Sequence, residues 1–287
     1  MRLQLVVNPS AGSGRAGKLL PRVREALSQH DLVVTPTSSL DHADELVAEA
    51  VADDRVVVAM GGDGIVGRVA GVIAPLGGLM TALPGGRGND FCRAVGIPAD
   101  LFDACRALPS WTEQALDLGY AGGTAFVGIA SIGFDSDVQE RVLRTRVPLG
   151  NLVYVYGSLL TLATFRQAHF TCTVDGEPLA FEGWNVAVSN SGRYGGGMRL
   201  APDASLTDGL LDLVTTSRTS KLRFLKALPK VFKATHIDEP AYAVRTATTV
   251  QLDADRPFRV FADGDPVATL PCEVTVRPGA VRVLVPS

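Results

Sequence analysis

Gly61-Gly62-Asp63-Gly64 is the stretch whose residue types point most directly to chemistry. It follows the apolar run Val56–Met60, which is typical of a buried strand, and precedes a helical stripe of apolar residues that begins at Ile65. A glycine turn between a strand and a helix N-terminus presents bare backbone N–H groups, which bind phosphate. Because a carboxylate beside phosphates is repulsive unless a cation lies between them, Asp63 indicates a Mg-nucleotide. The alternative is a tight strand–helix turn in which Asp63 is only a helix cap.

A second glycine loop, Pro84-Gly85-Gly86-Arg87-Gly88-Asn89-Asp90-Phe91, follows the predicted strand Leu79–Leu83. Asn89 or Asp90 is expected to cap the short helix that comes next. Strands that alternate with helices predict a parallel α/β sheet, in which successive strands end at one edge where ligands bind. Two glycine loops at that edge, each with a carboxylate, predict a nucleotide site.

The first predicted strand, Leu3–Val7, leads into a loop of small residues over 8–15 and a helix from about Ala16 to Ser28. Residues 12–18 imitate a P-loop, but Leu19 stands where a hydroxyl group should hold Mg²⁺. An overlapping G-x-G-x-x-G pattern lacks the acidic partner expected at the end of the second strand. A generic phosphate-facing loop is the interpretation that survives both objections.

Length and composition set the class of protein. The chain has 287 residues, 46% hydrophobic and 20% charged, which predicts one large or two ordinary globular domains. A net charge of -3 gives no sign of a nucleic-acid partner. The four cysteines are far apart and form no C-x-x-C, which argues against zinc and suits reduced thiols in a cytosol. The apolar run before Asn8 is too short for a signal peptide.

The second half has a different hydrophobic periodicity, typical of short strands, and predicts a β-rich, mainly antiparallel domain. The predicted strands are 125–134, 170–174, 184–189, 210–216, 248–252, 258–261 and 273–276. Asp175-Gly176 and Asp263-Gly264 predict hairpin turns.

Two segments bear on contact with a membrane. Residues 147–165 carry no charge but include interrupting Pro and Gly residues, which predicts a buried or cleft-lining helix, with a lipid-facing wall as the alternative. Residues 218–233 interleave basic and apolar residues without an acid, a pattern that suits the surface of an anionic membrane. The alternative for this second segment is a solvated helical face broken at Pro229.

A series of motifs in the same order resembles the diacylglycerol kinase catalytic domain family and its bacterial lipid kinases over nearly the whole chain. Gly61-Gly62-Asp63-Gly64 alone is shared with NAD kinases, so the resemblance depends on the further motifs. These are the loop at 8–12, Gly86-Arg87-Gly88-Asn89-Asp90-Phe91, Ser189-Asn190, Gly195-Gly196-Gly197-Met198 with Pro202 and Ala204, Asp208-Gly209-Leu210-Leu211-Asp212, and Asp263-Gly264-Asp265.

The resemblance implies an N-terminal three-layer α/β domain of NAD-kinase-like fold that binds ATP, over residues 1–120. It also implies a β-rich, sandwich-like domain on the acceptor side over 121–277, with a last strand at about 278–287 that returns to the first domain. The implied nucleotide-binding residues are Asn8, Pro9, Ser10, Ala11, Gly12, Thr37, Gly61, Gly62, Asp63, Gly64, Ile65, Val66, Gly67, Arg68, Arg87 and Asn89.

Two magnesium sites are implied as well. Asp63, Asp90 and Asp117 match acids that organise a catalytic Mg²⁺ through water. In the loop over 205–210, the carbonyls of Ser205 and Leu210 and the carboxylate of Asp208 match the ligands of a structural Mg²⁺, a set of oxygen donors that this ion prefers.

A general base is needed because an alcohol is a poor nucleophile at neutral pH. From the residues alone, Asp175 and Asp263 are equal candidates, and each could simply occupy a hairpin turn. The resemblance selects Asp263, since the family's catalytic D-G-E also lies near the C-terminus. Here Asp265 replaces the Glu, which keeps the charge but shortens the side chain.

The chain departs from the family pattern near the phosphates. Ile65 and Arg87 replace threonines, and Gly67-Arg68 replaces Asn-Glu. The arginines could serve phosphoryl transfer directly, or the changes could mark another nucleotide or a weakened enzyme.

The sequence and the resemblance together predict an ATP- and Mg²⁺-dependent lipid kinase that converts diacylglycerol to phosphatidic acid. It would work in the cytoplasm, attached peripherally to the inner face of the membrane, with a homodimer left open. The alternatives are a kinase for a sphingoid base, a glycolipid or NAD, and a nucleotide-binding protein without turnover.

Overall fold

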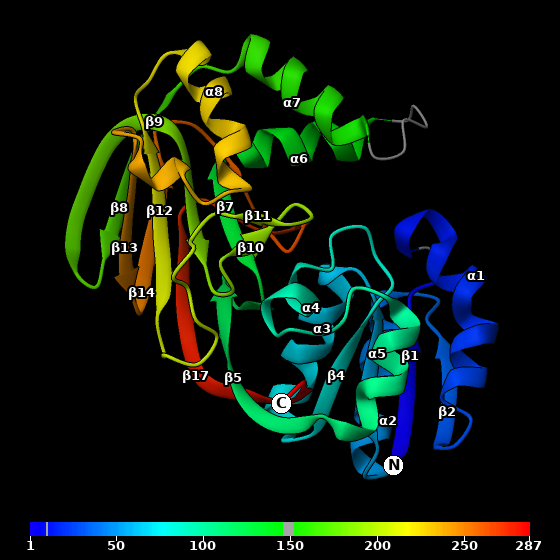
Figure 1. The fold of residues 1–287 in the computed structure, drawn as a ribbon. Helices are drawn as coiled ribbons and strands as arrows, with labels where there is room; N and C mark the ends of the chain where they lie inside the picture. The colour runs from blue at the N-terminus through cyan, green and yellow to red at the C-terminus, as the bar shows by residue number, and fades with distance from the viewer. Residues whose placement is uncertain (10, 146–151) are drawn as a thin grey trace.

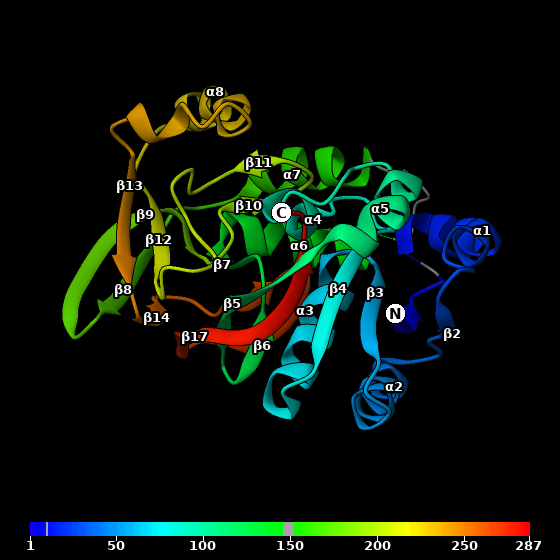
Figure 2. The same ribbon diagram turned by 60° about the horizontal axis from the view of Figure 1, so that its bottom comes forward.

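The computed structural model describes residues 1–9, 11–145 and 152–287. Its N-terminal half is a parallel sheet in the order β4-β3-β1-β2. These strands are β1 (Arg2–Val7), β2 (Asp31–Pro36), β3 (Val56–Gly61) and β4 (Leu79–Pro84). The helices are α1 (Ala11–Ala26), α2 (Leu40–Ala52), α3 (Asp63–Ile73), α4 (Asp90–Ala94) and α5 (Leu101–Ala107). Helices α2 and α3 pack together on one face of the sheet and α1 and α5 on the other, which makes three layers as predicted (Figure 2).

Helix α1 begins earlier than predicted. It starts at Ala11 rather than near Ala16, so the loop after β1 is shorter than the predicted segment over 8–15. Residues 11–14 are small, a composition that suits a loop but also permits a helical turn without steric clashes. Gly14 has a φ of 83°, a left-handed conformation that favours glycine. The predicted contact of Ser10 lies outside the described residues.

The C-terminal half is antiparallel and β-rich, as predicted, and its strands form one continuous mixed sheet with those of the first half (Figure 1). Its path runs β16-β15-β7-β9-β8-β14-β17, with β12 and β13 added beside β9. These strands are β7 (Ile129–Gly133), β8 (Ala168–Val174), β9 (Glu177–Ser189), β12 (Leu211–Ser217), β13 (Tyr242–Ala247), β14 (Thr249–Ala254), β15 (Arg259–Ala262), β16 (Asp265–Thr269) and β17 (Cys272–Val285). A short hairpin, β10 (Arg193–Tyr194) and β11 (Met198–Arg199), stands apart as a sheet of its own.

Strands β17 and β5 (Thr112–Ala121) join the two halves. Near its end β17 pairs in parallel with β4, where Arg282 lies opposite Leu79, and this confirms the predicted return to the first sheet. Its first part pairs with β14, and β5 lies antiparallel along nearly its whole length. A buried hydrogen bond from the Thr81 hydroxyl to the Leu284 carbonyl (2.8 Å) secures the return. The predicted division after residue 120 falls at the end of β5 and stays a prediction.

Both predicted hairpins form. Asp175 joins β8 to β9 and Asp263 joins β15 to β16, with φ values of 48° and 51° that Asp tolerates in tight turns. The predicted strand over 125–134 is instead divided into β6 (Thr124–Phe126) and β7. It is interrupted because the backbone N–H groups of Val127 and Gly128 bond to the Asp263 carboxylate rather than to a neighbouring strand.

Helices α6 (Phe134–Arg144), α7 (Leu152–Thr164) and α8 (Lys221–Val231) cover the upper end of the C-terminal half (Figure 1). Beneath them, Trp184 stacks on Phe224 with ring centroids 4.3 Å apart and also stacks on Phe165. This aromatic cluster is part of a core separate from that of the N-terminal half. The helices are therefore anchored to the sheet by large buried side chains.

Helix α7 is not buried. It lines a cleft with α6, as one of the predicted options had it, but its outer face exposes Val155 and Leu159, each to 56%. The predicted residues 147–151 lie outside the described part of the chain. Helix α8 is amphipathic as predicted, with Phe224 inward and basic residues outward, and Pro229 does not break it. Among the described residues, no helix is both long and apolar enough to span a membrane.

Candidate active site

The predicted loops meet at the C-terminal ends of β1, β3 and β4, here called the phosphate edge. Gly61 at the end of β3 lies opposite Pro84 at the end of β4. A Cβ atom at Gly86 would lie 2.4 Å from the Gly62 Cα, so the two glycine loops touch through their backbones. At the neighbouring strand ends, Thr37 donates its backbone N–H and its hydroxyl to the Val7 carbonyl, at 2.8 and 3.1 Å. The shared edge is confirmed.

Asp63 does not cap its own helix. The N-cap position of α3 is Gly62, and the Asp63 Oδ1 instead accepts the backbone N–H of Phe91 at 2.8 Å, in the first turn of α4. Asn89 stands at the N-cap of α4, as predicted, but its side chain bonds to the backbone N–H and carbonyl of Gly86 and makes no cap bond to the helix. Asp63 therefore fastens the first glycine loop to the second, and Asn89 braces the second loop internally.

Asp90 reaches toward the C-terminal half. Its Oδ2 accepts the backbone N–H of Gly196, between β10 and β11, at 2.8 Å. Its Oδ1 is buried and has no hydrogen-bond partner among the described residues. Burial raises the pKa of the Asp90 carboxyl, and the nearby charge of Asp63 adds to that rise. A Cβ atom at Gly88 would lie 3.0 Å from the Asp63 Oδ2 and 2.9 Å from the Asp90 Oδ2, so both carboxylates converge there.

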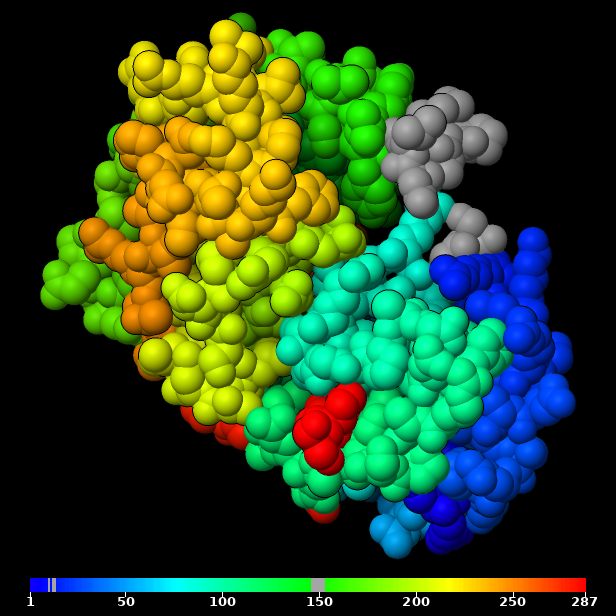
Figure 3. All heavy atoms as spheres, in the orientation of Figure 1, coloured from blue at the N-terminus to red at the C-terminus, as the bar shows by residue number. Residues whose placement is uncertain are grey.

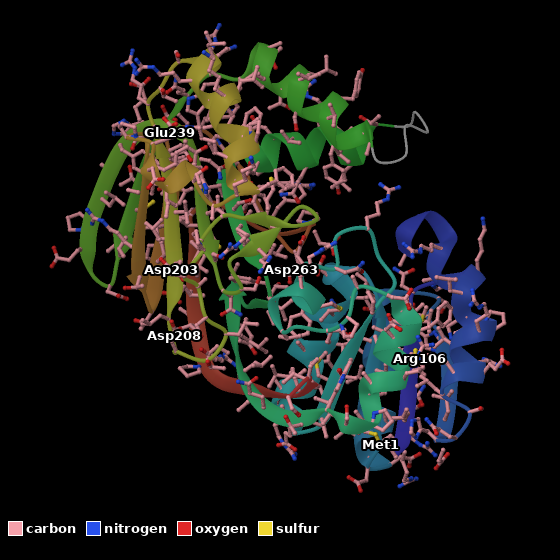
Figure 4. The ribbon with its side chains drawn as sticks, viewed as in Figure 1. Met1, Arg106, Asp203, Asp208, Glu239 and Asp263 are labelled. Atoms are coloured by element: carbon pink, nitrogen blue, oxygen red, sulfur yellow. The ribbon has the colours of Figure 1, made fainter. Side chains whose placement is uncertain are left out.

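Asp263 comes from the opposite half and lies between the two halves (Figure 4). Its Oδ2 accepts the Val127 N–H at 2.8 Å, and its Oδ1 accepts those of Gly128 and Ile129 at 2.8 and 3.3 Å. Burial raises the pKa of the Asp263 carboxyl to about 7, the charge of Asp63 adds to the rise, and the three N–H bonds oppose it. Asp263 is therefore held in place and titrates near neutral pH.

Two glycines of α3 make room for the acids of the β15–β16 turn. A Cβ atom at Gly67 would lie 2.6 Å from the Asp263 Oδ2, and one at Gly64 would lie 2.5 Å from the Asp265 Oδ2. Burial also raises the pKa of the Asp265 carboxyl. Gly67, where the resembled family has Asn, therefore has a packing reason: it lets the nucleotide-side helix approach Asp263.

Three other predicted nucleotide contacts have side chains turned elsewhere. Ile65 and Val66 are buried in the core of the N-terminal half. The Arg68 guanidinium donates to the Asp44 carboxylate on α2, with Nε to Oδ1 at 2.7 Å, and pairs with Asp41 at 3.5 Å. These contacts hold Arg68 at α2, so a phosphate-binding role for it stays a prediction.

Asp117 belongs to another set of contacts than Asp63 and Asp90. It lies on β5, and its two carboxylate oxygens accept the backbone N–H groups of Gly209 and Gly279, each at 2.7 Å. Across the part of the chain that the structure describes, no three His, Cys, Asp or Glu side chains are grouped to hold a metal directly. The structure thus pairs Asp63 with Asp90 but gives Asp117 partners in the loop over 205–210 and in β17.

The predicted structural-magnesium loop is acidic. Asp208 is exposed and its Oδ1 accepts the Leu210 N–H at 2.9 Å, while the Ser205 hydroxyl accepts the N–H of Thr207 at 3.2 Å. Burial, with the charges of Asp208 and Asp203, raises the pKa of Asp212 to about 6. In Figure 4, Asp203 and Asp208 lie on the outer part of the C-terminal half, away from Asp263.

A polar cluster that is not among the predicted site residues lies at the start of α6. The Asp135 Oδ2 accepts the Asn185 side-chain N–H at 2.8 Å, and Asn185 in turn accepts the Asp135 backbone N–H at 3.2 Å. Burial raises the pKa of Asp135 to about 6, although Asn185 and Tyr194 both hydrogen-bond to it. Burial raises the pKa of Tyr194, and the charge of Asp90 adds to that rise. The cluster therefore lies next to the pair of acids formed by Asp63 and Asp90. No local motif marks it, since Asp135 and Asn185 are 50 residues apart.

Two family models match this chain. One is described as the diacylglycerol kinase catalytic domain and matches residues 2–121; the other is described as the YegS C-terminal NAD kinase beta sandwich-like domain and matches residues 128–285. A diacylglycerol kinase of Mycobacterium tuberculosis (strain ATCC 25618 / H37Rv) is 31% identical over 296 residues, covering 99% of this chain and 95% of the relative. A probable lipid kinase YegS-like of Pseudomonas syringae pv. syringae (strain B728a) is 31% identical over 264 residues, covering 90% and 85%.

Among solved structures, a diacylglycerol kinase from Bacillus anthracis str. Sterne superimposes with a TM-score of 0.80 at 24% identity, covering 99% of this chain and 97% of the other, which shows a shared fold. The α/β half, the β-rich half and the two matching models define a two-domain phosphotransferase with an alcohol group as acceptor. The chain belongs to the diacylglycerol kinase family, among the lipid kinases.

Proposed function

We propose that the protein is an ATP-dependent lipid kinase that transfers the γ-phosphoryl group to the hydroxyl of diacylglycerol, giving phosphatidic acid. The observation that carries the proposal is the place of Asp263. A half-buried carboxyl whose pKa is raised to about 7 lies beside α3, the helix that begins at the phosphate edge. A proton acceptor on one side of the junction therefore faces a phosphate-binding edge on the other.

The chemistry that follows is a single in-line displacement. The Asp263 Oδ2 accepts one backbone N–H, which leaves a lone pair to take the acceptor's hydroxyl proton. The acceptor oxygen then bonds to the γ-phosphorus, the bond from that phosphorus to the bridging oxygen breaks, and ADP leaves with the bond electrons. The three N–H groups on Asp263 hold the carboxylate in position throughout.

The nucleotide side rests on the glycine loops. The backbone N–H groups around 61–64 and 85–88, after β3 and β4, would bind the phosphates. Arg87 lies in the second of these loops, and Asn8 and Thr37 directly follow β1 and β2 at the same edge of the sheet. We assign no phosphate contact to the side chains of Ile65, Val66 or Arg68, because they face the core and α2.

A magnesium ion fits between Asp63 and Asp90. The unpartnered, buried Oδ1 of Asp90 and the mutual repulsion of the two carboxylates are what a cation would relieve. Asp63 and Asp90 would hold the ion with water and phosphate oxygens completing its shell, and when bound it would neutralise charge on the phosphates. We keep Asp117 as a proposed contributor through water only.

The decisive test is a radiolabelled-ATP assay over vesicles that contain diacylglycerol, a sphingoid base or a glycolipid, with NAD as a soluble acceptor. Asp63→Ala should abolish lipid phosphorylation while the circular dichroism spectrum stays unchanged. Wild-type turnover in that variant would remove the core of the proposal. If another acceptor is phosphorylated in preference to diacylglycerol, the proposed substrate is wrong but the assignment of kinase activity stands.

The second candidate, a nucleotide-binding protein without turnover, was motivated by Ile65, Gly67 and Arg68. Gly67 and Arg68 now have structural reasons, since one accommodates Asp263 and the other pairs with Asp44. This candidate therefore depends on Ile65 alone, and any lipid phosphorylation at all would exclude it.

The site of action that we propose is the inner face of the membrane, reached from the cytoplasm, with the basic face of α8 as the attachment. A homodimer also stays a prediction.

A further inference from the structure

A cleft of about 590 Å³ opens between α6 and α7, apart from the phosphate edge and from Asp263. Arg256, which follows β14 in the chain, is one of the residues that line this cleft. In Figure 3, the green helices α6 and α7 are separated from the N-terminal half by a hollow, which is a different feature from the cleft between the two helices. None of the residues assigned above to the nucleotide, the base or the metal lines this cleft.

The charge in the cleft is mainly positive. Arg141, Arg144, Arg166 and Arg256 line it against only two acids, Asp137 and Glu140. Glu140 is already shared, since it accepts from Arg144 at 2.7 Å and from Arg259 at 3.4 Å. The cleft therefore holds more guanidinium charge than its own carboxylates can neutralise.

Two of these arginines have donors to spare. The Arg141 guanidinium bonds only to hydroxyls among the described residues, from Nε to the Thr161 Oγ1 at 3.2 Å and from Nη2 to the Thr164 Oγ1 at 3.4 Å. Arg166 is exposed, and its side chain makes no ion pair within the described part of the chain. Such groups can rotate toward an incoming anion without breaking a salt bridge.

Arg256 is fixed in place. Its guanidinium lies 4.1 Å from the ring centroid of Phe258 and 5.0 Å from that of Phe165. It donates to Asp137 at 3.4 Å and to the Arg166 carbonyl at 3.3 Å, while its buried Nε has no partner among the described residues. Because both of these bonds are donated by Nη2 and Nε is buried, Nη1 is the group of Arg256 that remains to donate to an oxyanion.

The rim of the cleft is apolar. Tyr156 and Leu160 form part of its wall and are exposed to 44% and 36%. On the same helix, Tyr154, Val155 and Leu159 are exposed to 48%, 56% and 56%. Large apolar side chains beside an anion site suit a ligand that joins an anionic group to hydrocarbon, and not a soluble anion alone.

We propose that this cleft binds the phosphate group of an anionic phospholipid, with the outer face of α7 in contact with its acyl chains. The site is distinct from the one at which the acceptor hydroxyl meets Asp263. The proposal builds on the proposed function only in placing the protein at a membrane. It gives that placement a headgroup preference that the basic face of α8 alone would not produce.

The test is binding of the full chain, without ATP or acceptor, to phosphatidylcholine vesicles containing either phosphatidic acid or cholesteryl hemisuccinate at matched surface charge. Arg144→Gln/Arg166→Gln removes two exposed cleft charges, and Arg141→Gln alone removes a third. Arg106→Gln is the matched control, because Arg106 is an exposed arginine on α5 in the other half (Figure 4). Melting temperatures will identify any variant that does not fold.

We expect the double variant to lose at least about tenfold in affinity for phosphatidic acid vesicles and much less for hemisuccinate vesicles, as removal of charge-assisted hydrogen bonds predicts. The control should match the wild type on both. Equal losses on the two kinds of vesicle, or no loss on either, would overturn the proposal. If glycerol 3-phosphate binds in a variant-sensitive manner and the vesicles do not, the ligand is a soluble phosphate and the lipid assignment is wrong. Because no phosphoryl transfer is measured, each result stands apart from whether the kinase proposal holds.

Discussion

A carboxyl group that accepts a proton near neutral pH must be kept from ionising too easily, and burial does this for Asp263. Exposed Asp ionises near pH 4, where it is a weak base. Asp263 keeps three N–H donors, which fix its direction, yet the loss of solvent outweighs them and its pKa rises to about 7. Asp175, the other Asp in a hairpin turn, has the opposite environment: hydrogen bonds from Thr248 and Thr249 lower its pKa. The two acids are therefore suited to different roles.

Asp263→Asn tests that difference directly. We expect it to bind ATP normally and to lower kcat by about 10²–10⁴-fold, the usual loss for a general base. Asp175→Asn, at the far turn between β8 and β9, should leave kcat near the wild-type value. The measurement is the initial rate of lipid phosphorylation at saturating ATP. If the two variants exchange behaviour, the assignment of the base is wrong.

The raised pKa also predicts a pH profile. The base works in its ionised form, so kcat/KM should rise with pH, reach half its plateau near pH 7 and level off above it. The rise should be absent from the residual activity of Asp263→Asn. A wild-type profile that is already flat from pH 5 upward would show that Asp263 is ionised throughout and that burial does not set its pKa.

Gly67→Ala tests the close approach of α3 to Asp263. The added methyl would lie 2.6 Å from the Asp263 Oδ2, so the carboxylate or the helix must shift. We expect stability to fall by about 1–3 kcal/mol, as overpacking does, and kcat to fall as well because the base is displaced.

Gly71→Ala on the same helix is the control, since its methyl would meet the Ala125 Cβ at 2.8 Å and no carboxylate. It should lose comparable stability in urea unfolding but keep its kcat. A Gly67→Ala variant with full activity would mean that the contact does not position the base.

At the scale of elements, local sequence patterns predicted the helices, strands and turns, but contacts between residues far apart in the chain could not be predicted. The strand–glycine–helix units and the hairpins at Asp175 and Asp263 follow from residues adjacent in sequence, whereas the return of β17 was implied only by the family resemblance. The partners of Asp117 and Arg68 could not be, because Gly209, Gly279 and Asp44 are remote in the chain and carry no motif pointing to them.

The exposure of α7 was also unreadable from sequence. An uncharged apolar segment is usually assigned to a core, and only the packing of α6 beside it shows which face is left to solvent. The start of α1 was misplaced for a similar reason, since glycine and alanine permit both a loop and a helix and only the contacts around β1 decide between them.

The loop over 205–210 gives a prediction at this scale. If it holds a structural Mg²⁺ through Asp208, millimolar Mg²⁺ without nucleotide should raise the unfolding free energy of the wild type by about 2.7 kcal/mol at a hundredfold excess over Kd. Asp208→Asn should lose most of that gain. Asp203→Asn, a neighbouring exposed acid outside the proposed ligand set, should keep it. A wild-type protein indifferent to Mg²⁺ would contradict the site.

At the scale of the whole molecule, the helices α6, α7 and α8 lie together along the upper end of the C-terminal half (Figure 1). A lipid acceptor has to reach Asp263 from a membrane, and no described helix spans one. The exposed apolar residues of α7 and the basic face of α8 therefore share the surface that we propose to face the lipid.

The basic face of α8 predicts attachment that depends on salt. Each basic residue near an anionic surface contributes on the order of 1 kcal/mol, and salt screens that attraction. Lys230 already pairs with Glu239, so its charge is partly neutralised, whereas Arg223 and Lys226 are exposed. Arg223→Glu/Lys226→Glu should thus weaken sedimentation with anionic vesicles more than Lys230→Glu does.

Salt gives a second test of the same attachment. Raising the salt concentration from about 0.05 to about 0.5 M should release the wild-type protein from the vesicles, because the Debye length shortens several-fold over that range. Attachment that survives both the salt and the double charge reversal would show that α8 is an ordinary solvated helix and that the protein is held to the lipid by α7 and the cleft beside it.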